Sequence, residues 1–333
     1  MNYINTEKFS KTLREKGYKK DSEEFLITNF KDSLQENDIT RGANCNGFGR
    51  VHHFRRYLTN DWPQNPLPID PACHALNIPR TDLLEVQLFQ NSICSWRCWY
   101  CFVDEKLLNG DKRYARYMSV NELIQLYLHE KDSPKVIDIS GGQPDLIPEW
   151  TLHFLKNLQE LRKKKQIYIW SDDNLSNEYL WKYLTKSELN YLCSAENYGR
   201  VGCFKGFDKN SFSFNTRAEP ELFNKQFKIM QRLVQAGFDV YGYVTLTTNN
   251  LDNVFNLVNS FIDRLQTEIH PIFPLRVIPL QILEFSPTKS RLNEITKYAL
   301  ETQYEVVCYW QEILSKRFSK KELENSIHLH KLH

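Results

Sequence analysis

From residue 84 onward, short runs of β-branched and aromatic residues alternate with longer segments whose apolar residues recur at helical spacing. This alternation is typical of βα units, in which each strand is followed by a helix that leads to the next parallel strand. The pattern predicts six units, with strands over residues 84–89, 136–139, 167–170, 201–204, 240–246 and 277–283.

The segments between these runs carry helix signals. Ser119 and Glu122 have the spacing of a capping box. Residues 148–165 begin with proline and end in a basic run, which suits the negative C-terminal end of a helix. The helix before the fifth strand stops at Gly237, a residue that readily ends helices. Further helices are expected over residues 178–184, 254–265 and 294–317.

Six βα units with right-handed crossovers predict an α/β fold with a parallel sheet, either curled into a partial barrel or flat with helices on both faces. Residues 1–80 mix short polar stretches with turn-rich pieces and show no sustained period. We therefore expect an N-terminal extension over residues 1–80 that caps the fold, a core over residues 81–288 and a helical segment over residues 289–333.

Charge and composition narrow the classes of partner. Lysine and arginine total 43 against 41 acidic residues. The resulting net charge of +2 gives the whole molecule no electrostatic field that would attract nucleic acid or an anionic membrane. No apolar run approaches the roughly 20 residues that a membrane helix needs, and the polar start lacks a signal-peptide core. Eight cysteines, three of them close together, favour reduced thiols that hold a metal in a cytoplasmic protein.

The three clustered cysteines follow the first strand directly, as Cys94, Cys98 and Cys101 in a CxxxCxxC pattern. Iron-sulfur cubanes normally take four thiolate ligands, so a loop with three leaves one iron available to another molecule. A structural zinc site is the alternative, but it needs four protein ligands, and only distant Cys45, Cys73 or a carboxylate could complete it. Spacing alone leaves both alternatives open.

This loop resembles the hallmark of the radical S-adenosylmethionine superfamily, CxxxCxφC after the first strand, where φ is aromatic and Tyr100 fills that position. The similarity continues through residues 116–123, which look like the family's entry into its first helix, and through Ser-Gly-Gly-Gln-Pro at residues 140–144, which is similar to the family's GGEP. The resemblance covers roughly residues 84–285. It implies a partial (β/α)6 barrel with a 4Fe-4S cluster on the three cysteines and S-adenosylmethionine bound beside it.

The same resemblance implies contacts to S-adenosylmethionine at the ends of the second and third strands. Gly141 and Gly142 would let the backbone approach the amino group of the cofactor, although an ordinary tight turn is the alternative. Gln143 stands where the family usually has glutamate, so a role that needs negative charge is in doubt. Ser171 and Asp173 occupy a polar turn that the family often uses for the ribose or carboxylate, and either could instead cap a helix.

The fourth strand looks like that of the glycyl-radical-activase branch, in which a lysine near the strand end meets the cofactor carboxylate. Lys205 would be that residue, and a surface lysine with a partly buried stem is the alternative. Thr245, Thr247 and Thr248 end the fifth strand and could line the same cavity, because ligand sites in parallel α/β folds lie beyond the C-terminal ends of the strands.

The resemblance implies an enzyme that cleaves S-adenosylmethionine reductively to a 5′-deoxyadenosyl radical and abstracts hydrogen from a substrate that the sequence does not identify. That substrate is expected to be a glycyl radical protein, a peptide or a small metabolite, and the electron would come from a reducing partner such as flavodoxin or ferredoxin. No side chain is singled out as catalytic. A scaffold that holds an iron-sulfur cluster or zinc and binds a partner without turnover is the alternative.

Overall fold

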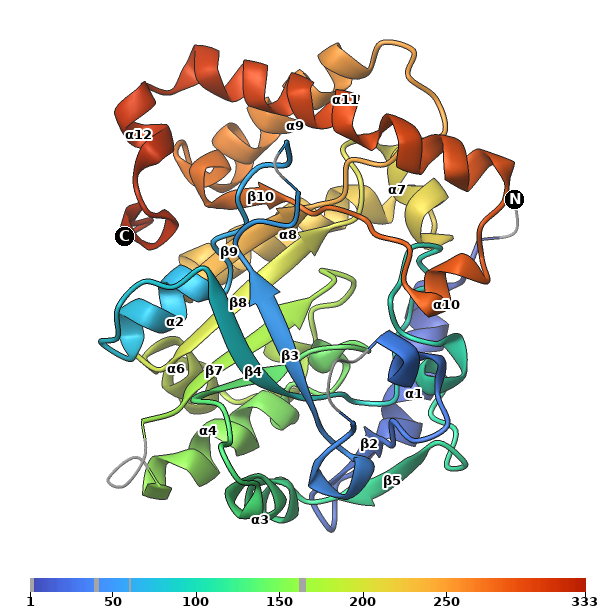
Figure 1. Cartoon of the computed structure of the whole chain (residues 1–333), viewed down its shortest axis with the longest axis vertical. Coiled ribbons are helices and arrows are strands. Elements are labelled where there is room, and N and C mark those ends of the chain that lie inside the picture. Colours follow the sequence, from blue (N-terminus) through green and yellow to red (C-terminus); the bar gives the residue numbers. More distant parts are fainter. Residues whose placement is uncertain (1–2, 39–41, 60, 162–165) are drawn as a thin grey trace.

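The chain was analysed as a computed structural model that describes residues 3–38, 42–59, 61–161 and 166–333. Its main sheet has seven strands in the order β10-β9-β8-β7-β6-β4-β3 (Figure 1). Six of them run parallel, and β3 pairs antiparallel with β4 at one edge. The strands are β3 (Arg50–Arg55), β4 (Leu83–Phe89), β6 (Val136–Ile139), β7 (Tyr168–Asp173), β8 (Tyr198–Phe204), β9 (Val240–Val244) and β10 (Val277–Pro279).

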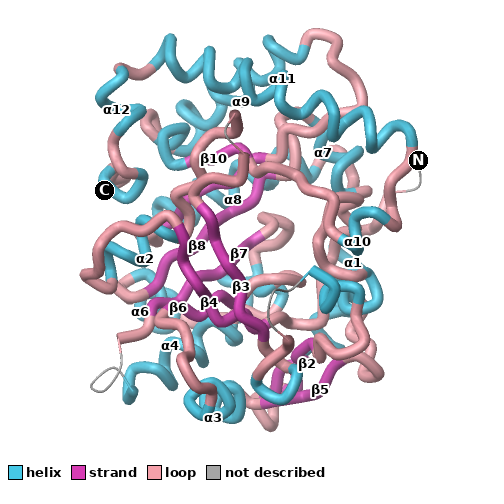
Figure 2. Tube along the Cα trace, viewed as in Figure 1, coloured by secondary structure: helices cyan, strands magenta, loops and turns pink. Residues whose placement is uncertain are grey.

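The six predicted parallel strands are confirmed, and the sheet curls into a half-barrel rather than staying flat (Figure 2). Several strand bounds differ from the sequence prediction: β8 begins three residues earlier, at Tyr198, and β9 ends two residues earlier, at Val244. β7 continues to Asp173 because Asp172 and Asp173 still pair with β8. β10 ends at Pro279, the last residue in register with β9, four residues before the predicted end.

Long helices cover the outer, convex face of the half-barrel (Figure 1). Their apolar faces and the outward residues of the strands form one large hydrophobic cluster, in which Ile169 on β7 and Val244 on β9 are fully buried. The principal helices are α3 (Val120–His129), α4 (Glu149–Leu161), α6 (Lys186–Cys193), α8 (Leu222–Gln235), α9 (Val254–Arg264) and α11 (Glu294–Arg317). The expected continuation of α4 through residues 162–165 lies outside the described residues.

Shorter helices connect these elements: α5 (Tyr179–Tyr183), α7 (Lys209–Thr216), α10 (Ser286–Lys289) and α12 (Lys320–Glu324). The capping box predicted for Ser119 and Glu122 is present at the start of α3. None of the described helices combines the length and the apolar content that crossing a bilayer requires.

The N-terminal region contributes to both sides of the half-barrel. Helix α1 (Thr6–Gly17) leads into a small sheet of β1 (Tyr18–Lys19), β2 (Glu24–Thr28) and β5 (Ala115–Met118). Helix α2 (Ile69–Ala75) instead packs on the inner, concave face, where Ile69, Val136 and Tyr168 belong to a second buried cluster. This cluster fills the inner face near the N-terminal ends of the strands, so polar inward residues lie toward the C-terminal ends. The division into extension, core and C-terminal segment stays a prediction.

Candidate functional site

The cysteine loop begins where β4 ends and is held by the small N-terminal sheet. The Thr28 amide donates to the Gln90 carbonyl at 2.9 Å, and the Ser92 amide donates to the Leu26 carbonyl at 3.0 Å. Further along, the Cys94 amide donates to the carbonyl of Leu108 at 3.1 Å. The sequence pattern did not reveal this support, because the pairing joins segments that are far apart along the chain.

Two side chains from the segment after β10 hold the other half of the cysteine loop. The Arg291 guanidinium donates to the carbonyl of Cys101 at 2.7 Å, to that of Cys98 at 3.3 Å and to that of Val103 at 2.5 Å. The Thr288 hydroxyl donates to the Tyr100 carbonyl at 3.3 Å. These bonds fix the backbone of the loop and leave its thiols available.

A buried asparagine joins the cysteine loop to the ends of β8 and β9. The Asn215 carboxamide oxygen accepts from the Trp99 indole at 3.0 Å, while its NH₂ group donates to the carbonyls of Lys205 at 2.9 Å and Thr247 at 3.1 Å. Asn215 lies on α7, which the sequence pattern did not predict. A buried asparagine with three such partners positions backbone, and only the structure reveals its partners.

The three cysteines are free thiols that influence one another. All three are half-buried, and no disulfide involves them. Burial raises the pKa of Cys98 to about 12, an effect that the Lys205 ammonium opposes and that negative charge on Cys101 and Cys94 increases. The thiols therefore lie within electrostatic reach of one another and of a half-buried cation that favours their thiolate forms.

Across the described part of the chain, no group of three or more His, Cys, Asp or Glu side chains is arranged to hold a single metal ion. Cys45 lies in a turn beside Glu130, and Cys73 lies on α2, so the residues that could have completed a zinc site sit on other elements. In a cubane each thiolate binds a different iron, so three thiols surround the cluster instead of meeting at one point. Three free thiols on one anchored loop fit that donor set.

The two glycines after β6 have positive φ angles, 73° at Gly141 and 70° at Gly142. A Cβ on Gly142 would lie 2.5 Å from the Asn91 carbonyl oxygen, and one on Gly141 would lie 2.3 Å from the Gln90 carboxamide oxygen. Both glycines therefore allow this turn to pack against the start of the cysteine loop. The structure gives them a packing role whether or not they also approach a ligand.

Gln143 also binds neighbouring loops. Its side-chain NH₂ donates to Asp173 at 2.6 Å, and its side-chain oxygen accepts from the Asn174 amide at 3.0 Å. Its own amide donates to the Ile93 carbonyl at 2.7 Å, next to the first cysteine. The polar atoms of this glutamine thus bond to other protein atoms, and they hold the neighbouring loops in position.

Because β7 continues to Asp173, two of the sequence candidates lie within a strand rather than in the turn expected after it. Ile169 belongs to the outer cluster and Trp170 to the inner one, so alternation puts Ser171 and Asp173 on the outer face. The Ser171 hydroxyl meets the hydroxyl of Tyr198 at 2.8 Å. Asp173 accepts from the Leu175 amide at 2.8 Å and pairs with Arg200 at 3.3 Å.

The same alternation turns Asp172 to the inner face, a residue that the sequence pattern did not single out. The Ser140 hydroxyl donates to its Oδ2 at 3.0 Å. Burial raises the pKa of Asp172 to about 6, and the Lys205 ammonium acts in the opposite direction. Trp170 faces inward, so continuing the two-residue alternation of the strand beyond it would have identified Asp172 as the next inward residue.

Lys205 follows β8 on the inner face, with its ammonium 5.8 Å from the ring centre of Tyr100. The Tyr100 hydroxyl lies 3.0 Å from that of Thr245 at the end of β9. The structure therefore brings together the cysteine loop, Tyr100, Lys205 and Asp172. Gln143, Ser171 and Asp173 lie behind this group, bound to other protein atoms.

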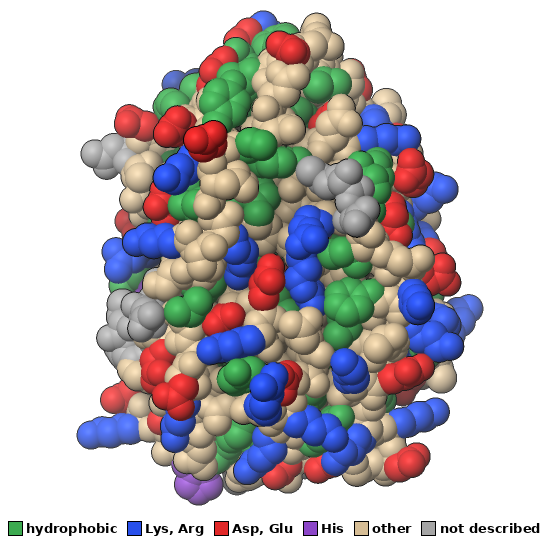
Figure 3. Space-filling view, turned by 90° about the vertical axis from the view of Figure 1, so that its right-hand side faces the viewer, with side chains coloured by type: hydrophobic (Ala, Val, Ile, Leu, Met, Phe, Trp, Pro, Cys, Tyr) green, Lys and Arg blue, Asp and Glu red, His purple; other side chains and the backbone are tan. Residues whose placement is uncertain are grey.

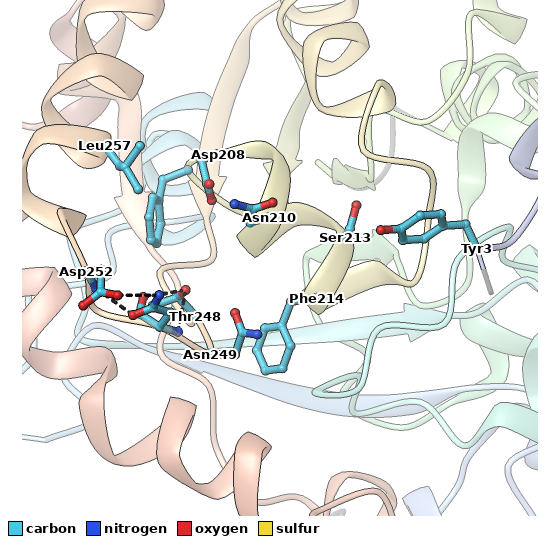
Figure 4. Close-up of a pocket in the computed structure, with 11 residues that line it drawn as sticks. Tyr3, Asp208, Asn210, Ser213, Phe214, Thr248, Asn249, Asp252 and Leu257 are labelled. Carbon is cyan, nitrogen blue, oxygen red and sulfur yellow. Dashed lines mark hydrogen bonds between the residues drawn. The ribbon is translucent and has the colours of Figure 1, made fainter. Parts of the chain in front are cut away.

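A polar cavity of about 340 Å³ lies beside the loops that follow β8 and β9 (Figure 4). Its walls include Asp208, Ser213 and Thr248, and Tyr3 closes one side. Phe214 also lines it and packs against Trp99 with ring centres 5.8 Å apart, so the cavity borders the cysteine loop. Of the three threonines expected to share a cavity, Thr248 lines this one.

The surface on the side of α1 and α10 mixes basic and acidic side chains, and neither sign dominates it (Figure 3). This distribution agrees with the small net charge of +2.

No protein-family model matches this sequence. Among curated proteins, the chain is 29% identical over 106 residues to a Methanocaldococcus jannaschii protein provisionally named a glycyl-radical enzyme activating enzyme. The match covers 32% of this chain and 28% of that protein, so it spans little more than a quarter of the relative's length.

Two solved structures share part of the architecture. SuiB of Streptococcus suis, solved with its precursor peptide SuiA, aligns with a TM-score of 0.39 and 18% identity over 54% of this chain and 36% of that one. The protein anSMEcpe with bound AdoMet aligns with a TM-score of 0.43 and 14% identity over 68% of this chain and 60% of that one. In its cysteine motif and in its match to the activating enzyme, the chain resembles the radical S-adenosylmethionine enzymes.

Proposed function

We propose that this chain is a radical S-adenosylmethionine enzyme, with a 4Fe-4S cluster on Cys94, Cys98 and Cys101 and S-adenosylmethionine beside it. When bound, the pair supplies one-electron cleavage of the cofactor to methionine and a 5′-deoxyadenosyl radical, which takes a hydrogen atom from the substrate. The observation that carries the proposal is the loop of three free thiols, fixed through its backbone at the C-terminal ends of the strands.

The inward residues around this loop supply the contacts that S-adenosylmethionine needs. The Lys205 ammonium offers a positive charge for a carboxylate, and Asp172 offers an acceptor for an amino group. The Tyr100 ring, held by Thr245, forms a wall between the loop and the end of β9. The backbone of Gly141 and Gly142 lies at the neighbouring strand end, where it is proposed to meet the same cofactor.

Gln143, Ser171 and Asp173 are proposed to act through other residues. Their polar atoms bond to protein, and together they fix the turn after β6 to β7 and β8. These residues are therefore proposed to support cofactor binding by holding other residues in place. Any loss of binding on their substitution should accompany a loss of stability.

Apolar side chains shield the other side of the loop from water. Trp99 and Tyr100 form a small buried cluster with Ile282 and Ala299. A reactive radical requires surroundings that exclude water and competing hydrogen donors. This cluster is proposed to supply part of that exclusion.

The name of the curated relative supports a glycyl radical protein as the substrate. The electron is proposed to come from a reducing partner such as flavodoxin or ferredoxin. Eight free cysteines support a cytoplasmic location, where thiols stay reduced.

The test is formation of 5′-deoxyadenosine from S-adenosylmethionine by the anaerobically reconstituted full chain after reduction with dithionite. Cys98→Ala should reduce the product at least a hundredfold, because the cluster loses one of its three thiolates. Cys308→Ala changes an exposed cysteine on α11 and should leave the yield unchanged. Equal yields from Cys98→Ala and the unaltered chain would refute the proposal.

A further inference from the structure

Asp138 is a buried carboxylate without a partner. It lies on β6 with 0% of its surface exposed, and neither of its oxygens has a hydrogen-bond partner within the described residues. Val136 belongs to the inner cluster, while Ile137 and Ile139 belong to the outer one. Alternation along β6 therefore turns Asp138 to the inner face of the half-barrel.

Two hydroxyls on the same face of the sheet already bond elsewhere. The Ser140 hydroxyl, just after the end of β6, donates to Asp172 at 3.0 Å. The Tyr243 hydroxyl meets the Asn65 carboxamide at 3.1 Å and donates to the Leu67 carbonyl at 3.2 Å. The Trp170 indole, opposite Asp138 on β7, likewise has no hydrogen-bond partner within the described residues, so both side chains leave bonding capacity open on the inner face.

A buried carboxyl group without a partner is costly. Removing an ion from water costs several kcal/mol even after relaxation, and a second carboxylate nearby adds repulsion. The charges that act on Asp138 are the negative Asp172 and the positive Arg50, whose guanidinium lies 5.7 Å from the Phe30 ring and 5.8 Å from the Phe102 ring. An apolar residue would suit the position better if only folding mattered.

Asp138 also lies close to Asp172, which belongs to the group of residues proposed to hold the cofactor. Lys205 acts on Asp172 and on Cys98, whereas Asp138 is influenced by Asp172 and Arg50. Asp172 lies on the same face as Asp138, two residues beyond Trp170, which pairs with Asp138 across β6 and β7. A ligand group at Asp138 would belong to a molecule that lies alongside the cofactor.

We propose that Asp138 receives a positively charged amino group of the substrate on the inner face of the half-barrel, while Asp172 serves the cofactor. An ammonium group has three donors and no acceptor, which matches a carboxylate with both oxygens open. The pairing would also remove the repulsion between the two acids. The proposal rests on the proposed function, since it names a chemical feature of that enzyme's substrate.

The amino group could belong to a lysine side chain of a protein or peptide, or to a small amine. Both sources share the alkylammonium group, so n-butylammonium and lysine blocked at both backbone ends are suitable probes. Each would be titrated into the anaerobically reconstituted full chain with S-adenosylmethionine present, and binding measured by calorimetry. Tighter binding of the blocked lysine would indicate a protein or peptide, and tighter binding of n-butylammonium a small amine.

We expect at least one probe to bind saturably, n-butanol not to bind, and Asp138→Asn to weaken probe binding at least tenfold. Asp21→Asn, which removes an exposed carboxylate in a turn near the N terminus, should leave probe binding unchanged. Circular dichroism would confirm that both variants are folded, and Asp138→Ser would replace Asp138→Asn if the latter did not fold. Equal binding of the probe by Asp138→Asn, or no preference for the cation over n-butanol, would overturn the proposal.

The binding of S-adenosylmethionine, measured separately by equilibrium dialysis, keeps the two proposals distinct. If the unaltered chain binds no S-adenosylmethionine, the proposed function fails whatever the probes do. If Asp138→Asn loses S-adenosylmethionine and the probe to the same extent, Asp138 serves the cofactor and the assignment to substrate is wrong.

Discussion

Asp172 places an acidic group inside the half-barrel, where burial raises its pKa from 3.8 to about 6. Between these values the folded protein holds a proton that the unfolded chain has lost, so the free energy of unfolding should fall as pH rises from about 4 to about 6. The contribution of this group is at most about 3 kcal/mol. Asp172→Asn should remove that part of the pH dependence.

Urea unfolding at several pH values between 4 and 8 would measure this effect as the difference between the unaltered chain and the variant. Asp21→Asn provides the control, since Asp21 is exposed. A pH profile that is the same for Asp172→Asn and the unaltered chain would show that Asp172 is not buried as described.

At the level of single residues, the sequence predicted which candidate residues lie at the same end of the sheet better than it predicted which way each side chain faces. The three cysteines, Tyr100 and Lys205 gather at one end of the sheet, as the spacing and the strand ends implied. Ser171 and Asp173 lie in the strand and face outward, because β7 ends three residues later than its apolar run suggested. If a strand end is placed a few residues too early, the inward residues beyond that end are not considered. Asp172 was missed for that reason.

At the scale of secondary-structure elements, the turn after β6 needs glycine for its backbone conformation and its close packing. Gly142→Ala should lower the free energy of unfolding by about 2 to 4 kcal/mol, because alanine is strained at its φ of 70° and its Cβ would meet the Asn91 backbone. Gly237→Ala is the control: its φ is 86°, but nothing lies within 4 Å of the added Cβ, so it should cost about 1 kcal/mol. Thermal and urea unfolding would compare them, and equal costs would contradict the close packing at Gly142.

The segment after β10 holds the cysteine loop through one arginine. Arg291→Gln should remove the hydrogen bonds to the carbonyls of Cys98, Cys101 and Val103 and lower stability by about 2 kcal/mol. It should also lower the iron retained after reconstitution, because the loop is less well fixed. Arg317→Gln, at the end of α11 and paired with Asp263, should leave iron retention unchanged. Equal iron in Arg291→Gln and the unaltered chain would show that the loop does not need this support.

Elements defined by local pattern were predictable, and those defined by distant pairing were not. Strands with continuous apolar runs and helices with caps, such as α3 with Ser119 and Glu122, carry their signal within a few residues. By contrast, β3 depends on pairing with β4, and β2 depends on pairing with β5 across about ninety residues of chain. Such pairing is not visible in the period of either strand alone.

For the whole molecule, the sequence predicted six parallel strands but left open whether the sheet curls. Both arrangements bury the strands on both faces, so the hydrophobic period is the same. The half-barrel is filled on its inside by α2 and the turn at Ile327–Leu329, two segments at opposite ends of the chain. Their polar and turn-rich surroundings gave no sign of that role.

The central claim is that one iron of a cluster on this chain is free of protein thiolates and takes S-adenosylmethionine. The most direct measurement is the electron paramagnetic resonance spectrum of the dithionite-reduced, reconstituted full chain, recorded before and after S-adenosylmethionine is added. The account predicts about four irons and four sulfides per chain and a signal that the cofactor shifts. A signal that the cofactor leaves unchanged, or a site filled by zinc with four side-chain ligands, would contradict it.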